Sequence, residues 1–143
     1  MKINQFKDGF AFLSNFHPVS IEYEGITYPS VEHAFQAAKS LDVEQRRRIA
    51  SISGGRGAKH AGRRLKLRPN WNEIKLSVME TLVRKKFEHP ELRQLLIDTH
   101  DMELIEGNTW GDQWWGVNLK TGKGENYLGK TLMKIRAEIT NKD

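Results

Sequence analysis

The sequence of 143 residues contains no cysteine. This absence excludes disulfide bonds, thiolate metal sites, iron–sulfur clusters and a thiol nucleophile. The chain also lacks any apolar run near the roughly 20 residues of a membrane span, and its start shows no secretory signal. We therefore expect a soluble cytoplasmic protein without a membrane partner, whose chemistry relies on carboxylates, histidine, lysine, hydroxyl groups or aromatic rings.

The composition indicates a folded chain with a basic surface. Hydrophobic residues make up 38% of the sequence, and 23 Lys+Arg against 18 Asp+Glu give a formal net charge of +5. The length predicts one compact domain over residues 1–143. The positive charge favours an anionic partner, either nucleic acid or a phosphorylated small molecule.

Hydrophobic periodicity predicts the class of fold. Alternation within residues 10–28 indicates extended chain, with a hairpin that turns at Glu24-Gly25, and a short strand is expected at 103–106. Apolar residues at helical spacing predict helices over 30–40, 73–88 and 128–140. Further helices are expected over 42–52, before Gly54-Gly55, and over 90–98, with Pro90 at its first position, and another turn or two over 58–66. Ser30 and Asn72 are expected to cap two of them. The expected fold is α+β, mainly helical, with a small N-terminal hairpin.

The helix predicted over residues 30–40 carries a polar row. At 100° per residue, Glu32, Gln36 and Lys39 lie within roughly 60° of one another. One interpretation is a solvated helix face with a weak Glu–Lys pairing. The other is a carboxylate and an amine that line one wall of a binding cleft.

A loop within residues 107–126 holds three tryptophans in six residues, Trp110, Trp114 and Trp115, with Asp112 among them. Indole rings on a surface loop expose a large apolar area, so we expect them to pack on something. They either close the edge of the core or form an aromatic platform for a planar base or a sugar. Asp112 between them is a candidate acid for proton transfer.

A glycine-rich turn, Gly54-Gly55-Arg56-Gly57, precedes the basic residues Lys59, His60, Arg63 and Arg64. Such a segment either binds a phosphate, through backbone amides and the basic side chains of Arg56, Lys59, Arg63 and Arg64, or simply leads into a solvated basic helix. The five histidines show no metal-ligand spacing, so we expect no metal ion.

Several separated motifs share an order and spacing that point to one family. They are FLSNF (12–16), YPSVEHAFQAAK (28–39), RPNW (68–71), KF (86–87), LIE (104–106), WG (115–116) and NYLGK (126–130). Together with Asp112, this pattern resembles the signature of the NADAR family, named for its proposed link to NAD and ADP-ribose. The likeness covers nearly the whole chain. One departure is Thr99-His100-Asp101 in place of the usual Thr-Gly-Asp, which affects a loop if that position has positive φ.

The resemblance implies an N-glycoside hydrolase, because family members cleave the ribose C1′–N bond of early riboflavin-pathway intermediates or remove ADP-ribose from guanine in DNA. It implies catalytic roles for Glu32, Asp112 and Lys39, of which the lysine is proposed to act covalently. Residues expected to contact the substrate are Trp71, Asn15, Phe16, Gln36, Trp110, Trp115 and Arg56. No cofactor is expected, and the partner is either a phosphorylated ribosyl small molecule or ADP-ribosylated guanine in DNA.

Two mechanisms suit these residues. In the first, one of Glu32 and Asp112 stabilises the cationic sugar while the other supplies a proton to the leaving nitrogen. In the second, Lys39 forms a Schiff base with the ring-opened C1′. The alternative function is a non-catalytic module that binds ADP-ribose or ADP-ribosylated nucleic acid through its basic face and its tryptophans.

Overall fold

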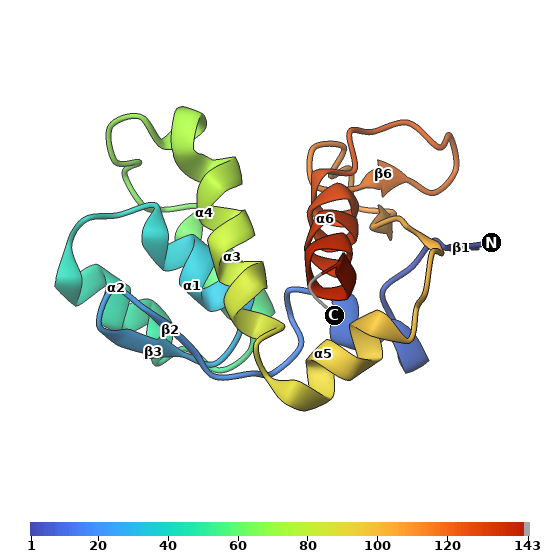
Figure 1. Ribbon diagram of the computed structural model, residues 1–143. Helices are drawn as coiled ribbons and strands as arrows, with labels where there is room; N and C mark the ends of the chain where they lie inside the picture. Colours follow the sequence, from blue (N-terminus) through green and yellow to red (C-terminus); the bar gives the residue numbers. More distant parts are fainter. Residues whose placement is uncertain (142–143) are drawn as a thin grey trace. The chain divides into compact units, whose positions relative to one another are not determined.

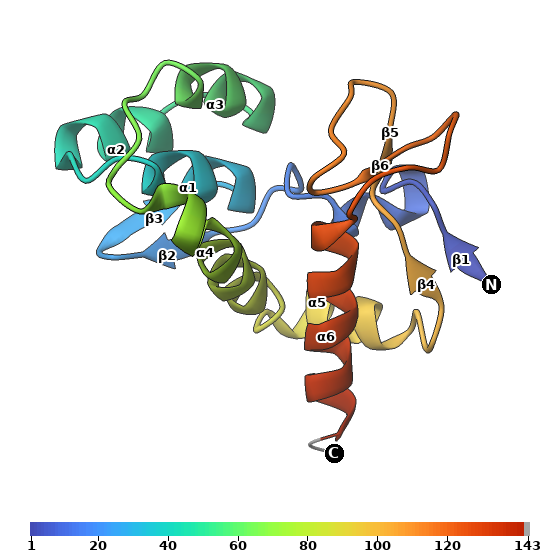
Figure 2. The ribbon, with the colours of Figure 1, turned by 90° about the horizontal axis from the view of Figure 1, so that it is seen from above.

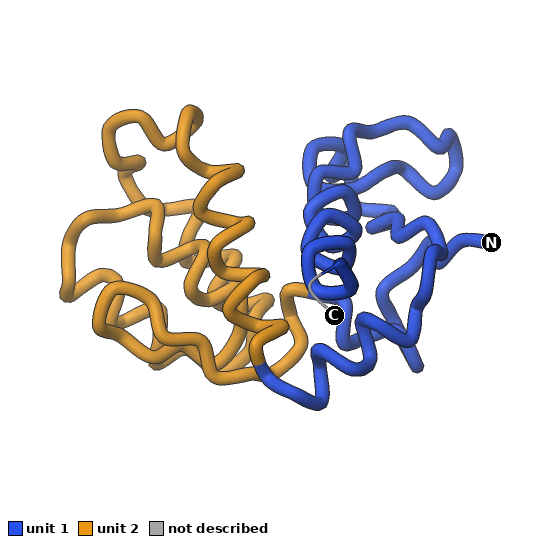
Figure 3. The backbone as a smooth tube through the Cα atoms, viewed as in Figure 1, with its two compact units in different colours: residues 1–14, 89–143 blue, residues 15–88 orange. Residues whose placement is uncertain are grey.

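The computed structural model describes residues 1–141 and divides the chain into two compact units (Figure 3). Unit 1 consists of Met1–Ser14 and His89–Asp143, and unit 2 of Asn15–Glu88. Unit 2 is therefore one continuous stretch, which lies in sequence between the two segments of unit 1. No helix in the described part of the chain is long and apolar enough to cross a membrane.

Unit 2 begins with the predicted hairpin (Figure 1). Strand β2 (Ile21–Tyr23) pairs antiparallel with β3 (Ile26–Tyr28). The two turn residues, Glu24 and Gly25, have φ of 48° and 87°. Positive φ at both positions matches the right-handed twist of the strands, so this short turn confirms the prediction.

Helix α1 (Val31–Ala38) is the central helix of unit 2, and all its residues except Glu32 are buried. The side chain of Ser30 accepts a hydrogen bond of 3.1 Å from the backbone N–H of His33, which confirms Ser30 as the cap. The other helices of the unit all contact α1 (Figure 2): α2 (Val43–Ala50), α3 (Gly55–Gly62) and α4 (Trp71–Lys86).

The start of α4 differs from the prediction. We expected Asn72 to cap it, but the helix begins at Trp71 after Asn70, whose φ is 64°. The backbone carbonyl of Asn70 already accepts from the N–H groups of Glu73 and Ile74, at 3.0 and 3.1 Å. Asn72 therefore lies inside the helix, where its side chain has no capping role. Helix α3 also begins earlier than expected, directly after Gly54.

In unit 1, the prediction of extended chain from residue 10 is wrong. Residues 8–13 form a 3₁₀-helix, η1 (Asp8–Leu13), although the alternation indicated extended chain from residue 10. Phe12 and Leu13 are both buried. Two consecutive side chains of a strand point to opposite faces, so a lone extended segment cannot bury both on one side, whereas a helical turn can.

The rest of unit 1 consists of two helices and two short pairs of parallel strands. Strand β1 (Lys2–Ile3) pairs with β4 (Glu103–Leu104), and β5 (Gly107–Asn108) pairs with β6 (Val117–Asn118). Helix α6 (Tyr127–Asn141) packs against β4 and against α5 (Pro90–Ile97). His100, which replaces the usual glycine, has φ of 54°, so this loop does adopt the left-handed conformation. The predicted mainly helical α+β class is confirmed.

Candidate functional site

The predicted site residues fall into two groups, one in each unit. Unit 2 contains Glu32, Gln36, Lys39, Trp71, Asn15, Phe16 and Arg56. Unit 1 contains Asp112, Trp110 and Trp115.

The polar row of α1 is largely covered by other parts of unit 2. Gln36 is only 5% exposed, and Glu32 and Lys39 are half-buried. The side-chain amide of Gln36 donates a hydrogen bond of 2.7 Å to Oε2 of Glu32. The row is therefore not a solvated helix face, and the carboxylate of Glu32 is held in one orientation by its neighbour one turn later.

Helix α3 covers this row at Gly62. A Cβ atom at position 62 would collide with Oε1, Cδ and Cβ of Gln36, so only glycine allows this close approach of the two helices. Oε1 of Gln36 is buried and accepts no hydrogen bond from the described residues. The conformation of Gln36 is consequently set by two features, the contact with Gly62 and the hydrogen bond to Glu32.

The pKa of Lys39 is below the ordinary value for lysine. Burial is the largest cause, and the charges of Arg63, Lys59 and Lys75 lower the pKa further, while Glu32 acts in the opposite direction. A lowered pKa increases the fraction of neutral amine near pH 7, which is the form that attacks carbonyl carbon. Lys39 thus has the environment of a nucleophilic lysine beside a carboxylate.

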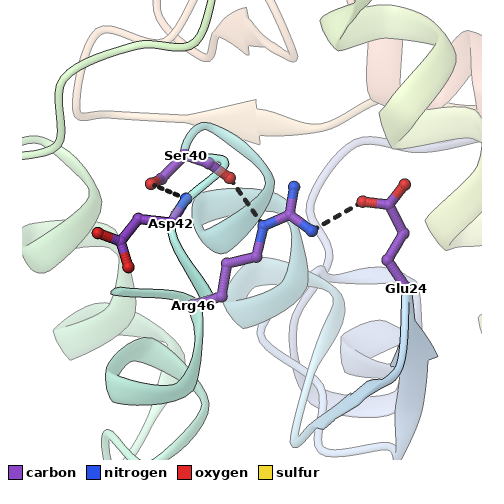
Figure 4. A network of polar contacts seen from close by, with 4 residues as sticks. All are labelled: Glu24, Ser40, Asp42 and Arg46. Carbon is purple, nitrogen blue, oxygen red and sulfur yellow. Dashed lines mark hydrogen bonds and ion pairs between the residues drawn. The ribbon is translucent and has the colours of Figure 1, made fainter. Parts of the chain in front are cut away.

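The backbone at the end of α1 is held from two sides. The carbonyl of Lys39 accepts a hydrogen bond of 2.8 Å from the N–H of Arg68. The carbonyl of Ser40 accepts one of 2.7 Å from Nε of the buried Arg46, whose Nη1 forms an ion pair of 2.7 Å with Glu24 (Figure 4). The hydroxyl of Ser40 also accepts from the N–H of Asp42 at 3.0 Å. These contacts fix the chain at the position from which the Lys39 side chain extends.

Asn15 and Phe16 lie beside the first turn of α1 and of α3. The carbonyl of Asn15 accepts a hydrogen bond of 3.0 Å from the N–H of Glu32, and Nδ2 of Asn15 donates to Sδ of Met79 at 3.5 Å. The ring of Phe16, which is 39% exposed, lies against Gly55. Asn15 therefore positions the helix turn that carries Glu32, and Phe16 offers an exposed ring near it.

Trp71 and Arg56 have contrasting surroundings. Trp71 is 5% exposed and packs on Phe35, with ring centroids 5.2 Å apart and an interplanar angle of 51°. Arg56 is exposed in the first turn of α3. Contact of either residue with substrate stays a prediction.

His33, next to Glu32 in sequence, has both ring nitrogens engaged elsewhere. Nδ1 lies 2.7 Å from Oγ of Ser30, and Nε2 lies 2.9 Å from the carbonyl of Ile52. A carbonyl only accepts, so Nε2 carries the proton, and Nδ1 accepts from the Ser30 hydroxyl in the neutral ring. His33 therefore ties α1 to the segment before α3.

In unit 1, Asp112 organises the tryptophan loop. Its Oδ1 accepts hydrogen bonds from the backbone N–H groups of Trp114 and Trp115, at 3.1 and 2.9 Å. Its own N–H and carbonyl bind the side chain of Asn108, at 3.1 and 2.9 Å. Among the described residues, no hydrogen bond reaches Oδ2 of Asp112. One oxygen of this carboxylate shapes the loop, and the other is available for a different task.

The tryptophans of the loop differ in their surroundings, and a platform for a base or a sugar stays a prediction. Trp114 packs on Tyr127 with centroids 4.4 Å apart and meets Trp115 edge-on at 6.3 Å. Trp110, by contrast, is 61% exposed. Trp114 thus anchors the loop on α6, while Trp110 presents a large aromatic surface.

Lys75 was missed as a site residue by reasoning from sequence. The available signal was its position one turn after Trp71, the last residue of the RPNW motif. In residues 1–141 there is no group of three or more His, Asp or Glu side chains that could hold a metal ion.

The protein thus has a mainly helical α+β fold with a carboxylate and a lysine on the central helix of unit 2. We compared it with protein families and with relatives of known name. The family model described as "NADAR domain" matches residues 3–140. The chain belongs to this family, as the motifs indicated.

Relatives with assigned names agree with the predicted class of enzyme. The chain is 42% identical over 135 residues to "N-glycosidase YbiA" of Escherichia coli, a match that covers 92% of this chain and 83% of that protein. It is 35% identical to "N-glycosidase Npun_R5314" of Nostoc punctiforme, with coverage of 92% and 87%. It is also 35% identical to "Riboflavin biosynthesis protein VVA0006" of Vibrio vulnificus, covering 92% of this chain but 36% of that longer protein.

The fold is similar to that of a solved relative. An NMR structure of the E. coli protein YbiA matches with a TM-score of 0.86 and 37% sequence identity, covering 99% of this chain and 85% of the other. The names of these relatives are those of enzymes and favour a hydrolase over the binding module considered above.

Proposed function

We propose that this N-glycosidase hydrolyses the bond between C1′ of a phosphorylated ribose and the nitrogen of a base, and that Glu32 and Lys39 carry out the reaction. The observation that supports this proposal is their arrangement on α1. Glu32 is oriented by Gln36, and it lies in electrostatic contact with an amine whose pKa is lowered. This pair suits a reaction that needs both a proton carrier and a nucleophile.

The chemistry of the bond explains the need for a carboxylate. When the C1′–N bond breaks, positive charge develops at C1′ and the ring oxygen, and the leaving nitrogen requires a proton. An ionised Glu32 would stabilise the charge and position a water molecule. Asp112, through its Oδ2, is the proposed second carboxylate, as the family resemblance implies.

The lowered pKa of Lys39 favours the covalent route. In this route the C1′–O4′ bond breaks as O4′ takes up a proton and C1′ forms a double bond to the nitrogen of the base, and the neutral amine of Lys39 then adds to C1′. The C1′–N bond to the base then breaks, the base leaves with a proton relayed by Glu32, and a Schiff base remains. Water adds to its C1′, so that ribose is released as the aldehyde and Lys39 is regenerated as the amine. The net reaction consumes one water and yields free base and ribose.

The proposed substrate is an early riboflavin-pathway intermediate that carries a phosphoribosyl group. The name of the Vibrio vulnificus relative supports this choice. ADP-ribosylated guanine in DNA is the second candidate, which is favoured by the net charge of +5 and by the exposed ring of Trp110.

Direct assay separates these possibilities. The protein is incubated with each phosphoribosyl intermediate and with DNA containing ADP-ribosylated guanine, and free base, ribose 5-phosphate and ADP-ribose are measured. We expect base release from the first class, and loss of release in Glu32→Gln with an unchanged circular dichroism spectrum. Glu44→Gln, at an exposed position of α2, serves as the matched control. Full activity in Glu32→Gln would overturn the assignment.

A further inference from the structure

Two basic residues of α3, Lys59 and Arg63, lie along one side of the face that packs against α1. The buried residues of α3 are Gly55, Ala58 and Gly62, and Gly62 contacts Gln36 of the polar row. At 100° per residue, Lys59 lies about 60° from Gly62, and Arg63 lies about 40° from Lys59. Both side chains therefore start beside the contact with Gln36, on the same side of it.

A third basic residue faces α1 from α4. Lys75 is one turn after Trp71 and one turn before Met79, so the three side chains share one face of α4. Trp71 packs on Phe35 of α1, and Met79 accepts a hydrogen bond from Asn15, whose carbonyl binds the N–H of Glu32. The half-buried Lys75 thus lies on the face of α4 that is directed at α1.

The local charge is strongly positive. The charges of Arg63, Lys59 and Lys75 all lower the pKa of Lys39, which places them within electrostatic range of its amine. Among the described residues, Glu32 is the one acid that acts on this amine in the opposite direction.

We propose that Lys59, Arg63 and Lys75 form a subsite that binds the 5′-phosphoryl group of the ribosyl substrate and so places C1′ at Lys39. This proposal rests on the proposed function and adds the residues that determine its specificity for phosphorylated ribose. A phosphate group accepts charge-assisted hydrogen bonds from lysine and from the planar guanidinium of arginine. The same chemistry fits a ribose 5-phosphate and the diphosphate of ADP-ribose.

The subsite shares Lys59 and Arg63 with the basic stretch from Arg56 to Arg64 that the sequence offered for phosphate, and it adds Lys75. Arg56 is left out because it precedes Arg63 by seven residues, which is about 10 Å along the helix. Arg64 is hydrogen-bonded to His60 at 3.2 Å, and it projects from α3 about 140° away from Lys59. The three proposed residues are instead those whose charges act on the Lys39 amine.

Binding of product tests the subsite without turnover. In the Glu32→Gln background, titration calorimetry measures the Kd of D-ribose 5-phosphate, D-ribose and ADP-ribose for Lys59→Gln, Arg63→Gln and Lys75→Gln. Each substitution is expected to raise the Kd of ribose 5-phosphate about tenfold, in line with the loss of one charge-assisted contact, and to leave that of D-ribose unchanged. Arg48→Gln removes one exposed charge from α2 as a control for net charge. A larger loss for ADP-ribose than for ribose 5-phosphate identifies the diphosphate as the group bound.

The outcomes separate this proposal from the function on which it rests. If base release continues and KM for the phosphorylated substrate is unchanged in the three variants, the subsite is wrong and the function stands. If wild type releases no base but the variants lose ribose 5-phosphate binding, the subsite stands and the function is wrong. Equal losses for D-ribose, or a larger loss in Arg56→Gln than in the three variants, also overturn the subsite. Circular dichroism identifies any variant that fails to fold. At such a position the glutamine variant is replaced by the charge-conserving one, Lys→Arg or Arg→Lys, and we expect that variant to retain ribose 5-phosphate binding.

Discussion

Gln36 donates a hydrogen bond of 2.7 Å from Nε2 to Oε2 of Glu32, one turn earlier on α1. The same side chain is pressed against Gly62 of α3. The orientation of the proposed catalytic carboxylate therefore depends on a neutral residue and, through it, on the absence of a side chain on another helix.

The first prediction concerns this hydrogen bond. Gln36→Met keeps the length of the side chain but removes the donor, and a hydrogen bond to a charged group contributes roughly 1.5–3 kcal/mol. If the bond orients Glu32 for reaction, kcat for base release falls by about tenfold to a hundredfold. The matched control is Gln94→Met, because Gln94 donates an analogous bond of 2.8 Å to Asp98 on the exposed face of α5. Equal effects of the two substitutions on kcat would contradict the positioning role.

The second prediction concerns the helix contact. Gly62→Ala introduces a Cβ that collides with three atoms of Gln36, so either the helices separate or Gln36 changes rotamer. We expect a loss of stability of about 1–3 kcal/mol in denaturant unfolding, as is typical of overpacking, together with reduced kcat. Gly9→Ala, where a Cβ meets no atom within 4 Å, is the control and should leave kcat unchanged.

The third prediction tests Lys39 through pH. Treatment with borohydride during turnover should trap a protein–ribose adduct in wild type and none in Lys39→Ala. Because only the neutral amine attacks, the trapping rate should rise as pH increases through the pKa of Lys39, which lies below the ordinary value.

Substitution of Arg63 tests the direction in which the pH dependence of trapping shifts. Its charge lowers the pKa of Lys39, so Arg63→Gln should shift the rise in trapping rate to higher pH, whereas Arg48→Gln should not shift it. Absence of any adduct in wild type would rule out the lysine route and leave the carboxylate route.

Local patterns were sufficient to predict the hairpin and the row on α1. A Glu-Gly turn between alternating residues and a serine before an apolar repeat act over a few positions, and both features form as expected. The polar row could also be predicted, because helical spacing alone places Glu32, Gln36 and Lys39 together.

Other features depend on contacts between distant residues. Phe12 and Leu13 are both buried in η1, which contacts the distant helix α5, and this packing overrides the alternation that indicated a strand. Asn72 loses its capping role because the chain turns at Asn70. Helical spacing places Lys75 one turn after Trp71, but only the contacts of Trp71 with Phe35 and of Met79 with Asn15 show that this face of α4 is directed at α1.

The fourth prediction concerns Lys86, which is 1% exposed. Burial lowers its pKa to about 7 from an ordinary value of 10.5. Between these two values the unfolded chain binds a proton that the folded chain does not. The free energy of unfolding therefore rises with pH over this range, and the cost of burying the charge is fully present below pH 7.

Lys86→Met removes this dependence. Denaturant unfolding of wild type should show a gain on the order of 3 kcal/mol between pH 7 and 10 that the variant lacks. The neighbouring Lys85→Met serves as the control and should retain the gain. Parallel pH profiles of wild type and Lys86→Met would show that this amine does not titrate in that range.

The fifth prediction separates two roles of Asp112. Asp112→Asn keeps an oxygen that can accept from the N–H groups of Trp114 and Trp115, but removes the charge, whereas Asp112→Ala removes both. Tryptophan fluorescence should therefore stay near that of wild type in the Asn variant and change in the Ala variant, because only the latter releases the loop. If Oδ2 acts in catalysis, kcat falls by at least a hundredfold in both variants. If Asp112 only shapes the loop, the Asn variant keeps most of its activity, and the second carboxylate of the reaction must be sought elsewhere.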